Sequence, residues 1–206
     1  MSLRGEIKLN SFDLMGVRID PLTMDETVQA VEKFVLEQRP LHLMGVNADK
    51  INQCQTDESI KKIVNDSEII NADGASVVLA SRFLGYQVPE RVAGIDLMQE
   101  LLRLANEKGY SVYFFGAKEE VLNDMLTIFK KDYPNLRVEG HRNGYFSAEE
   151  EEAIQEDIRE KNPDFVFVGI TSPKKEYLIQ KFMDNGVNSV FMGVGGSFDV
   201  LSGHIK

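Results

Sequence analysis

The sequence lacks the residues from which several kinds of site are built. It has one cysteine, Cys54, so no disulfide can form within the chain, and its three histidines are scattered along it. No group of cysteines and histidines has the spacing of zinc ligands. We therefore expect a protein of a reducing compartment that contains no metal site.

Basic residues and long apolar runs are also scarce. The chain has 23 Lys and Arg against 33 Asp and Glu, a formal charge of -10, whereas binding to nucleic acid needs clustered basic residues. No apolar run approaches the roughly 20 residues that cross a bilayer, and no signal peptide precedes the first predicted strand. The sequence predicts a soluble or peripheral protein of the cytoplasm that does not bind nucleic acid.

Short apolar runs alternate with helical patterns over the whole chain of 206 residues, without a linker or an internal repeat. This alternation is typical of βα units that build a mostly parallel sheet, so we expect one α/β, Rossmann-like domain over residues 1–206 with helices on both faces. The predicted strands are Leu14–Ile19, Leu41–Val46, Glu68–Asn71, Val112–Phe115, Phe165–Ile170 and Ser189–Val194.

Two capping boxes mark helix starts. Thr23 with Glu26, and Ser147 with Glu150, each place a hydroxyl and a carboxylate where they can bond otherwise unpaired amides. The first helix then has an apolar face that should pack on the sheet, made of Val28, Val31, Phe34 and Val35.

Polar residues follow the first two buried strands directly, at the sheet edge where open α/β proteins bind ligands. Asn47 and Asp49 follow one strand, and Asn47 can donate and accept hydrogen bonds to a sugar. Asp73 and Gly74 follow the next, where burial beside an apolar strand would raise the pKa of Asp73 and suit it to be a general base. The alternative is that these side chains only cap the helices that follow.

The loop from Glu90 to Asp96 contains Arg91, Gly94 and Asp96 and leads into a helix. Arg91 could hold a diphosphate through paired N–H donors, although an ion pair with Glu90 or Asp96 is the alternative. The next strand ends in Gly116 and Ala117, as a nucleotide site would require, but the G-x-G-x-x-G pattern is absent.

The last two strand ends resemble anion-binding sites. Gly169 precedes a stretch in which Ser172 is predicted to cap a helix and Pro173 to begin it, beside Lys174, Lys175 and Glu176. After the final strand, Gly195 would let the backbone approach a ligand. Phe198 and Asp199 complete the predicted site residues at this strand end, and the Phe198 ring could stack on a base or sugar.

The order and spacing of five segments resemble the WecG/TagA/CpsF glycosyltransferases from Leu14 onward. The segments are Asn47-Ala48-Asp49, Asp73-Gly74, Glu90 to Leu97, Pro173 to Glu176, and Gly193 to Asp199. The resemblance implies a bacterial enzyme that moves a sugar, N-acetylmannosamine or a related hexose, from a UDP-sugar to a polyprenyl-diphosphate-linked acceptor. It implies inversion, surface-polysaccharide or teichoic-acid synthesis, and no required metal or other cofactor.

The resemblance also implies roles for particular residues. Asp73 would be the base, Asn47 would lie beside the donor sugar, and Arg91 with the two late strand ends would line the nucleotide site. Three departures limit this transfer. Gly45-Val46-Asn47 stands where the family commonly has Thr-Pro-Asn, Lys175 stands where it commonly has Gln, and members usually continue past Lys206.

That further segment is basic and is thought to bring family members to the inner face of the cell membrane. Without it we expect binding of a UDP-sugar but poor turnover, unless a partner supplies the missing part. Apolar surface left exposed by its absence would favour a homo-oligomer. Two other hypotheses stay open: a catalytically impaired nucleotide-sugar-binding or assembly subunit, and a nucleotide-dependent oxidoreductase on a similar sheet.

Overall fold

A computed structural model describes residues 10–205. Residues 1–9 and Lys206, which belong to the predicted domain of residues 1–206, lie outside the described part. The elements in chain order are β1 (Phe12–Leu14), β2 (Val17–Ile19), α1 (Met24–Leu36), β3 (Leu41–Val46), α2 (Ala48–Thr56), α3 (Glu58–Asp66), β4 (Ile70–Ala72), α4 (Ala75–Phe83), α5 (Gly94–Lys108), β5 (Ser111–Gly116), α6 (Glu119–Asp132), β6 (Arg137–Arg142), α7 (Ala148–Lys161), β7 (Phe165–Gly169), α8 (Lys174–Asp184), β8 (Val190–Gly193) and α9 (Ser197–Leu201).

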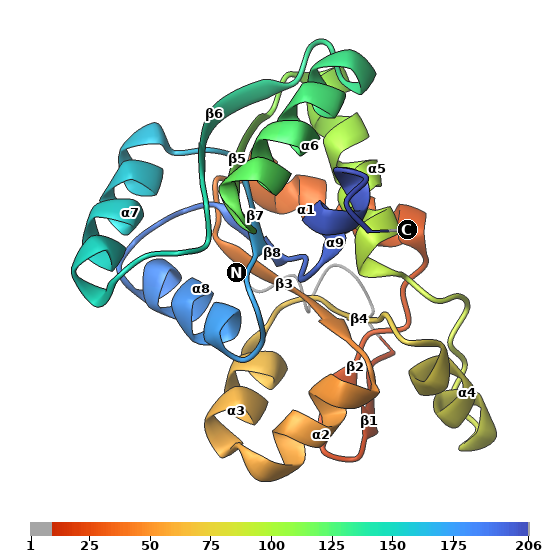
Figure 1. The fold of residues 1–206 in the computed structure, drawn as a ribbon. Coiled ribbons are helices and arrows are strands. Elements are labelled where there is room, and N and C mark those ends of the chain that lie inside the picture. The colour runs from red at the N-terminus through yellow and green to blue at the C-terminus, as the bar shows by residue number, and fades with distance from the viewer. Residues whose placement is uncertain (1–9, 206) are drawn as a thin grey trace.

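The main sheet is parallel throughout, with the strand order β4-β3-β8-β7-β5-β6 within the described residues. Helices cover both faces: α5 and α6 lie on one side of the sheet, and α7 and α8 lie on the other (Figure 1). This arrangement confirms the predicted α/β, Rossmann-like fold. It places the carboxyl ends of β4, β3 and β8 next to one another.

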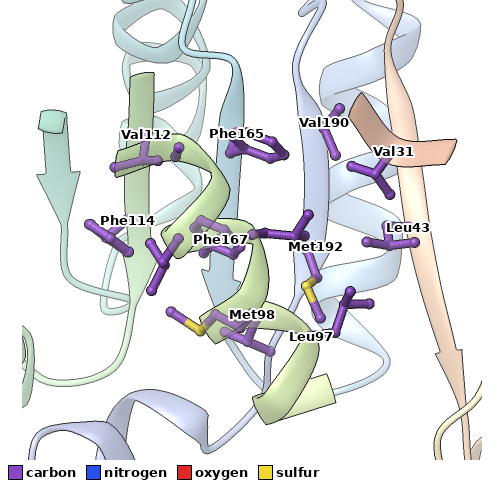
Figure 2. Packing of buried hydrophobic residues seen from close by; sticks show 14 of the residues in the cluster. Val31, Leu43, Leu97, Met98, Val112, Phe114, Phe165, Phe167, Val190 and Met192 are labelled. Carbon is purple, nitrogen blue, oxygen red and sulfur yellow. The ribbon is translucent and has the colours of Figure 1, made fainter. Parts of the chain in front are cut away.

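The core on the α5 side is made of apolar side chains from the helices and from alternate positions of the strands. Leu97 and Met98 of α5 lie beside Met192 of β8 and Phe167 of β7 (Figure 2). The rings of Phe167 and Phe114 stack with their centroids 5.8 Å apart. Each large apolar side chain buried in this way contributes about 1.5–3 kcal/mol, and together they fix α5, and therefore its first turn, against the sheet.

Both predicted capping boxes form. The Thr23 hydroxyl accepts from the Glu26 amide at 3.2 Å while the Glu26 carboxylate accepts from the Thr23 amide at 2.8 Å, and Ser147 and Glu150 make the same exchange. The predicted apolar face of α1 packs on the sheet, with Val31 and Phe34 buried. The helix starts that could be read from hydroxyl and carboxylate spacing are therefore confirmed.

Two predictions about strands are wrong. Leu14–Ile19 is not one strand but the antiparallel pair β1 and β2, because Met15 and Gly16 adopt positive φ angles of 56° and 80° and reverse the chain. The edge strand β6 was missed, since its residues are largely polar and partly exposed and do not alternate as a buried strand would. Neither difference alters the position of the strands that carry the predicted site residues.

Candidate active site

A cavity of about 600 Å³ lies at the carboxyl ends of β4, β3 and β8. The first turn of α5, the start of α2 and the junction between β7 and α8 complete its walls. The structure brings nine predicted site residues to this cavity: Asn47, Asp49, Asp73, Gly74, Arg91, Gly94, Lys175, Glu176 and Gly195.

Asp73 is held in place through one carboxylate oxygen, and there is room for a ligand around the other. Its Oδ1 accepts a hydrogen bond from the Gly94 amide at 3.1 Å, at the start of α5. Around Oδ2 there is room, because the nearest backbone positions are glycines: a Cβ on Gly45 would lie 3.3 Å from this oxygen and one on Gly94 3.4 Å from it. The expectation that Asp73 caps α4 is wrong, since α4 has Gly74 as its N-cap and no side-chain cap.

The pKa of Asp73 lies above its ordinary value. Burial is the main cause of the increase, and the negative charge of Asp96 adds to it. The hydrogen bond from Gly94 and the positive charge of Arg91 oppose the increase without cancelling it. A carboxylate whose proton affinity is raised in a cavity has the property that a general base needs.

Asn47 and Gly74 bring the ends of β3 and β4 close together. A Cβ on Gly74 would lie only 3.0 Å from the Asn47 Cβ, so the glycine permits this approach. Asn47 is the N-cap of α2, and its Oδ1 accepts from the Lys50 amide at 2.9 Å, as the capping interpretation predicted. Asn47 nevertheless lines the cavity together with Asp49, so capping and ligand binding are compatible here.

Arg91 does not form the ion pair that was its alternative interpretation. Within residues 10–205 no carboxylate lies within 4.0 Å of its guanidinium, and Glu90 instead accepts a hydrogen bond from the Met24 amide at the start of α1. Arg91 is exposed at the cavity wall, so its five N–H donors can turn toward an anionic ligand.

A buried group of charges lies across the cavity from Asp73. Glu176, 1% exposed, accepts from Lys50 Nζ at 2.7 Å and lies 3.0 Å from Lys175 Nζ, while the Ser172 hydroxyl is 2.9 Å from its second oxygen. Burial by itself would raise the pKa of Glu176, but the ammonium groups of Lys175 and Lys50 outweigh it and hold this pKa at about 2. Burial lowers the pKa of Lys50, and Glu176 offsets part of that change.

This arrangement directs Lys175 into the cavity. Its side-chain stem crosses Gly193, where a Cβ would come within 2.6 Å of Lys175 Cε. Two positive charges and one negative charge leave an excess positive charge on this wall. The prediction that Ser172 caps α8 is wrong, because Pro173 occupies the N-cap position and the Ser172 hydroxyl joins the charged group instead.

Seven predicted site residues lie outside this cavity: Asp96, Gly116, Ala117, Gly169, Lys174, Phe198 and Asp199. Gly116 and Gly169 instead let β5 and β7 approach, since a Cβ on Gly116 would lie 2.4 Å from the Gly169 carbonyl. Lys174 Nζ lies 4.2 Å from the centre of the Phe146 ring. Phe198 is fully buried against Phe114, so the expectation that its ring stacks on a ligand is wrong.

Four buried polar residues that line the cavity were not among the predicted site residues: His42, Lys50, Asn71 and Ser197. Burial lowers the pKa of His42 to about 4, so its imidazole is neutral near pH 7. Asn71 lies two residues before Asp73, and the alternation of a strand could have indicated that both side chains share one face. Nothing in the sequence connected His42 with the lysines of α2 and α8.

Within residues 10–205, no three His, Cys, Asp or Glu side chains are grouped so that they could hold a metal ion, and no helix is long and apolar enough to cross a membrane.

Comparison with known proteins gives one consistent result. The family model described as "Glycosyl transferase WecG/TagA/CpsF family" matches residues 12–206. The N-acetylglucosaminyldiphosphoundecaprenol N-acetyl-beta-D-mannosaminyltransferase of Bacillus subtilis (strain 168) is 34% identical over 143 residues, which is 69% of this chain and 55% of that enzyme. The protein of the same name from Staphylococcus aureus (strain NCTC 8325 / PS 47) is 33% identical over 196 residues, 94% of this chain and 76% of that enzyme. The matched segment thus spans little more than half of the Bacillus relative.

Proposed function

Since this chain belongs to the WecG/TagA/CpsF family of glycosyltransferases, we propose that it transfers a hexose from a UDP-sugar to a polyprenyl-diphosphate-linked sugar. The names of the relatives favour N-acetylmannosamine as the transferred sugar and N-acetylglucosaminyl-diphospho-polyprenol as the acceptor. Such a product would serve teichoic-acid or other cell-surface polysaccharide synthesis. Because this acceptor is lipid-linked, we place the reaction at the inner face of the cell membrane.

The observation that carries this proposal is the Oδ2 of Asp73, which lies in the cavity wall and has no hydrogen-bond partner within the described residues. An acceptor hydroxyl bound there would give its proton to Asp73 while its oxygen forms a bond to the anomeric carbon of the donor sugar. The bond from that carbon to the UDP oxygen breaks on the opposite face, so the configuration inverts. The β-linkage in the relatives' names agrees with inversion of an α-linked donor.

The departing diphosphate needs stabilisation of its negative charge, because base catalysis supplies only about two to four powers of ten in rate. We assign this role to Arg91, which has no ion-pair partner within the described residues, and to Lys175, which Glu176 holds at the cavity wall. Both lie on the cavity together with Asp73, as electrostatic stabilisation of a leaving group requires.

Replacing Asp73 by Asn tests the assignment. The Asn side chain keeps an oxygen for the Gly94 amide and loses only the negative charge and the basicity. We expect kcat/KM for transfer from UDP-N-acetylmannosamine to a short-chain N-acetylglucosaminyl-diphospho-lipid to fall by roughly 10²–10⁴-fold. Binding of UDP, measured by calorimetric titration, should be unchanged.

Asp25→Asn is the matched control, since Asp25 is an exposed carboxylate in the first turn of α1 that does not line the cavity. Its turnover should match that of the wild type. Full turnover by the Asp73 variant would exclude Asp73 as the base. Binding of UDP without turnover by the wild-type chain would favour the nucleotide-sugar-binding or assembly subunit.

A further inference from the structure

Asn71 has a buried polar atom without a hydrogen-bond partner. Its side chain is in β4, lines the cavity and belongs to a residue that is 1% exposed. Its Oδ1 lies 3.4 Å from Thr27 Oγ1, and its Nδ2 has no partner within the described residues. Buried side-chain amides are nearly always hydrogen-bonded, so an unpaired one beside a cavity indicates a ligand that supplies the missing bond.

The unpaired atom remains whichever way the amide of Asn71 is turned. The Thr27 hydroxyl already donates to the Thr23 carbonyl at 2.8 Å, so it can accept from an Asn71 nitrogen. Exchanging the nitrogen and oxygen of Asn71 would therefore leave the oxygen unpaired in place of the nitrogen. A hydroxyl is both a donor and an acceptor, and it pairs with either orientation. The chemistry that fits this position is a hydroxyl group.

The position of Asn71 relative to Asp73 indicates which hydroxyl. Asp73 directly follows the last residue of β4, and a Cβ on Gly45, the register partner of Asn71, would lie 3.3 Å from Asp73 Oδ2, so the side chains of Asn71 and Asp73 share one face. Two residues of extended chain span roughly 6.6 Å, which is comparable to the width of a hexose ring. On the neighbouring strand, Asn71 is paired with Gly45, which has no side chain to fill the space beside the two residues. A hexose that reaches Asp73 with one oxygen can therefore place another near Asn71.

Resting on the proposed function, we infer that Asn71 binds a hydroxyl of the hexose that contacts Asp73, and so helps to determine which sugar is accepted. A sugar without that hydroxyl, or with it inverted, would leave the amide unpaired and would bind less well. The donor hexose and the acceptor hexose share this chemistry, and kinetics can tell them apart.

The first test compares the stability of ligand-free proteins. Asn71→Leu replaces the amide by an apolar group of similar size. It removes the unpaired Nδ2 together with the long 3.4 Å contact to Thr27 Oγ1, so the fold should lose no net stability. We expect the variant to unfold at the same temperature as the wild type or at a higher one. Unfolding at a lower temperature would show that Asn71 serves the fold and would overturn the inference. This arm does not depend on the proposed transfer activity.

The second test is kinetic, with UDP-N-acetylmannosamine and a short-chain N-acetylglucosaminyl-diphospho-lipid as substrates. We expect Asn71→Leu to raise one KM by roughly three- to tenfold, as loss of one neutral hydrogen bond does, and the substrate whose KM rises more identifies the sugar. The control Thr27→Val removes the neighbouring hydroxyl from a residue that does not line the cavity, and it should change each KM by less than about twofold.

Unchanged KM values for both substrates in Asn71→Leu would overturn the inference. Failure of the proposed function would be seen separately, as the absence of sugar transfer by the wild-type chain.

Discussion

At the scale of single residues, Asp73 has one carboxylate oxygen anchored and room around the other. Its Oδ1 is held by the amide at the start of α5, while glycines at positions 45 and 94 leave room around Oδ2. A larger residue at either position would meet the carboxylate itself. The reactivity proposed for Asp73 therefore depends on two neighbours that have no side chain.

The raised pKa of Asp73 predicts a pH dependence of the rate. Only the ionised carboxylate can take a proton, so kcat/KM should fall as the pH drops through this pKa. The midpoint of the decrease should lie above about 3.9, the ordinary value for aspartate. Measuring kcat/KM across pH checks this, and the residual rate of Asp73→Asn should show no such limb. A midpoint at or below the ordinary value would contradict the prediction.

The raised pKa of Asp73 also predicts that the free energy of unfolding decreases over the pH range in which kcat/KM increases. Because the folded protein binds the Asp73 proton more tightly than the unfolded chain, ionisation lowers the free energy of unfolding as pH rises through the raised pKa. The free energy of unfolding of Asp73→Asn at pH 7 should therefore be at least that of the wild type, although its kcat/KM for sugar transfer is expected to be much lower. This combination separates a catalytic residue from a structural one.

The sequence identified Asp73 but not its partner. It placed the carboxylate at a strand end, and the ordinary expectation was that it caps the helix that follows. The amide that it binds belongs to Gly94, 21 positions later, and the contact depends on how α5 packs on the sheet. Phe198 illustrates the opposite error: beside a glycine-rich loop it resembled a stacking residue, but the close approach of Gly169 to its ring makes it part of the core.

At the scale of elements, the charged group around Glu176 joins α2 to the start of α8. Lys50 comes from α2 and contacts Glu176 and Ser172 from the β7–α8 segment. A buried carboxylate of this kind is stable only while its cationic partners remain. Helices α2 and α8, which both contribute residues to the cavity wall, are thus held together by a few charged atoms.

Removing the charge of Glu176 should destabilise the fold. Glu176→Gln leaves Lys50 buried without its counter-ion, and we expect a decrease of about 3–5 kcal/mol in the free energy of unfolding, measured with denaturant at pH 7. Since the folded pKa of Glu176 is about 2, below the ordinary glutamate value, this contribution is present at neutral pH and is lost as pH falls toward 2.

Glu139→Gln is a suitable control for that measurement. Glu139 pairs with Arg137 at 2.8 Å on the exposed strand β6, where an ion pair contributes at most about 1 kcal/mol. Equal effects of the two substitutions would contradict the special role of Glu176.

Among the elements, those with strong local signals were predicted best. β3 matches its predicted bounds because it is a short, mostly apolar run that is buried at every position except Gly45. Gly109 ends α5 in the left-handed conformation, as glycine commonly does at a helix end. The turn at Met15 was missed because methionine is not a typical residue for a positive φ. The charged group around Glu176 could not have been predicted, since Lys50 lies 126 positions before Glu176.

At the scale of the whole molecule, the hypotheses of a sugar transferase and of an oxidoreductase differ in the nucleotide that they require. We expect UDP to raise the midpoint of thermal unfolding and NAD to leave it unchanged. Saturation at about 100 times the dissociation constant would add roughly 2.7 kcal/mol to the free energy of unfolding. Arg91→Ala, which removes an exposed cation from the cavity, should reduce the shift by UDP. Stabilisation by NAD alone would contradict the proposed function.

The strand order of the main sheet also has a consequence for how the protein is made. β8 lies between β3 and β7, so Leu41 of β3 cannot pair in the middle of the sheet until Val190 of β8 is present. During translation β3 and β7 therefore each keep one unpaired edge until Val190 has been synthesised and has left the ribosome. Unpaired edges are templates for aggregation, and pairing over such separations is slow, so the nascent chain is most vulnerable just before β8 inserts.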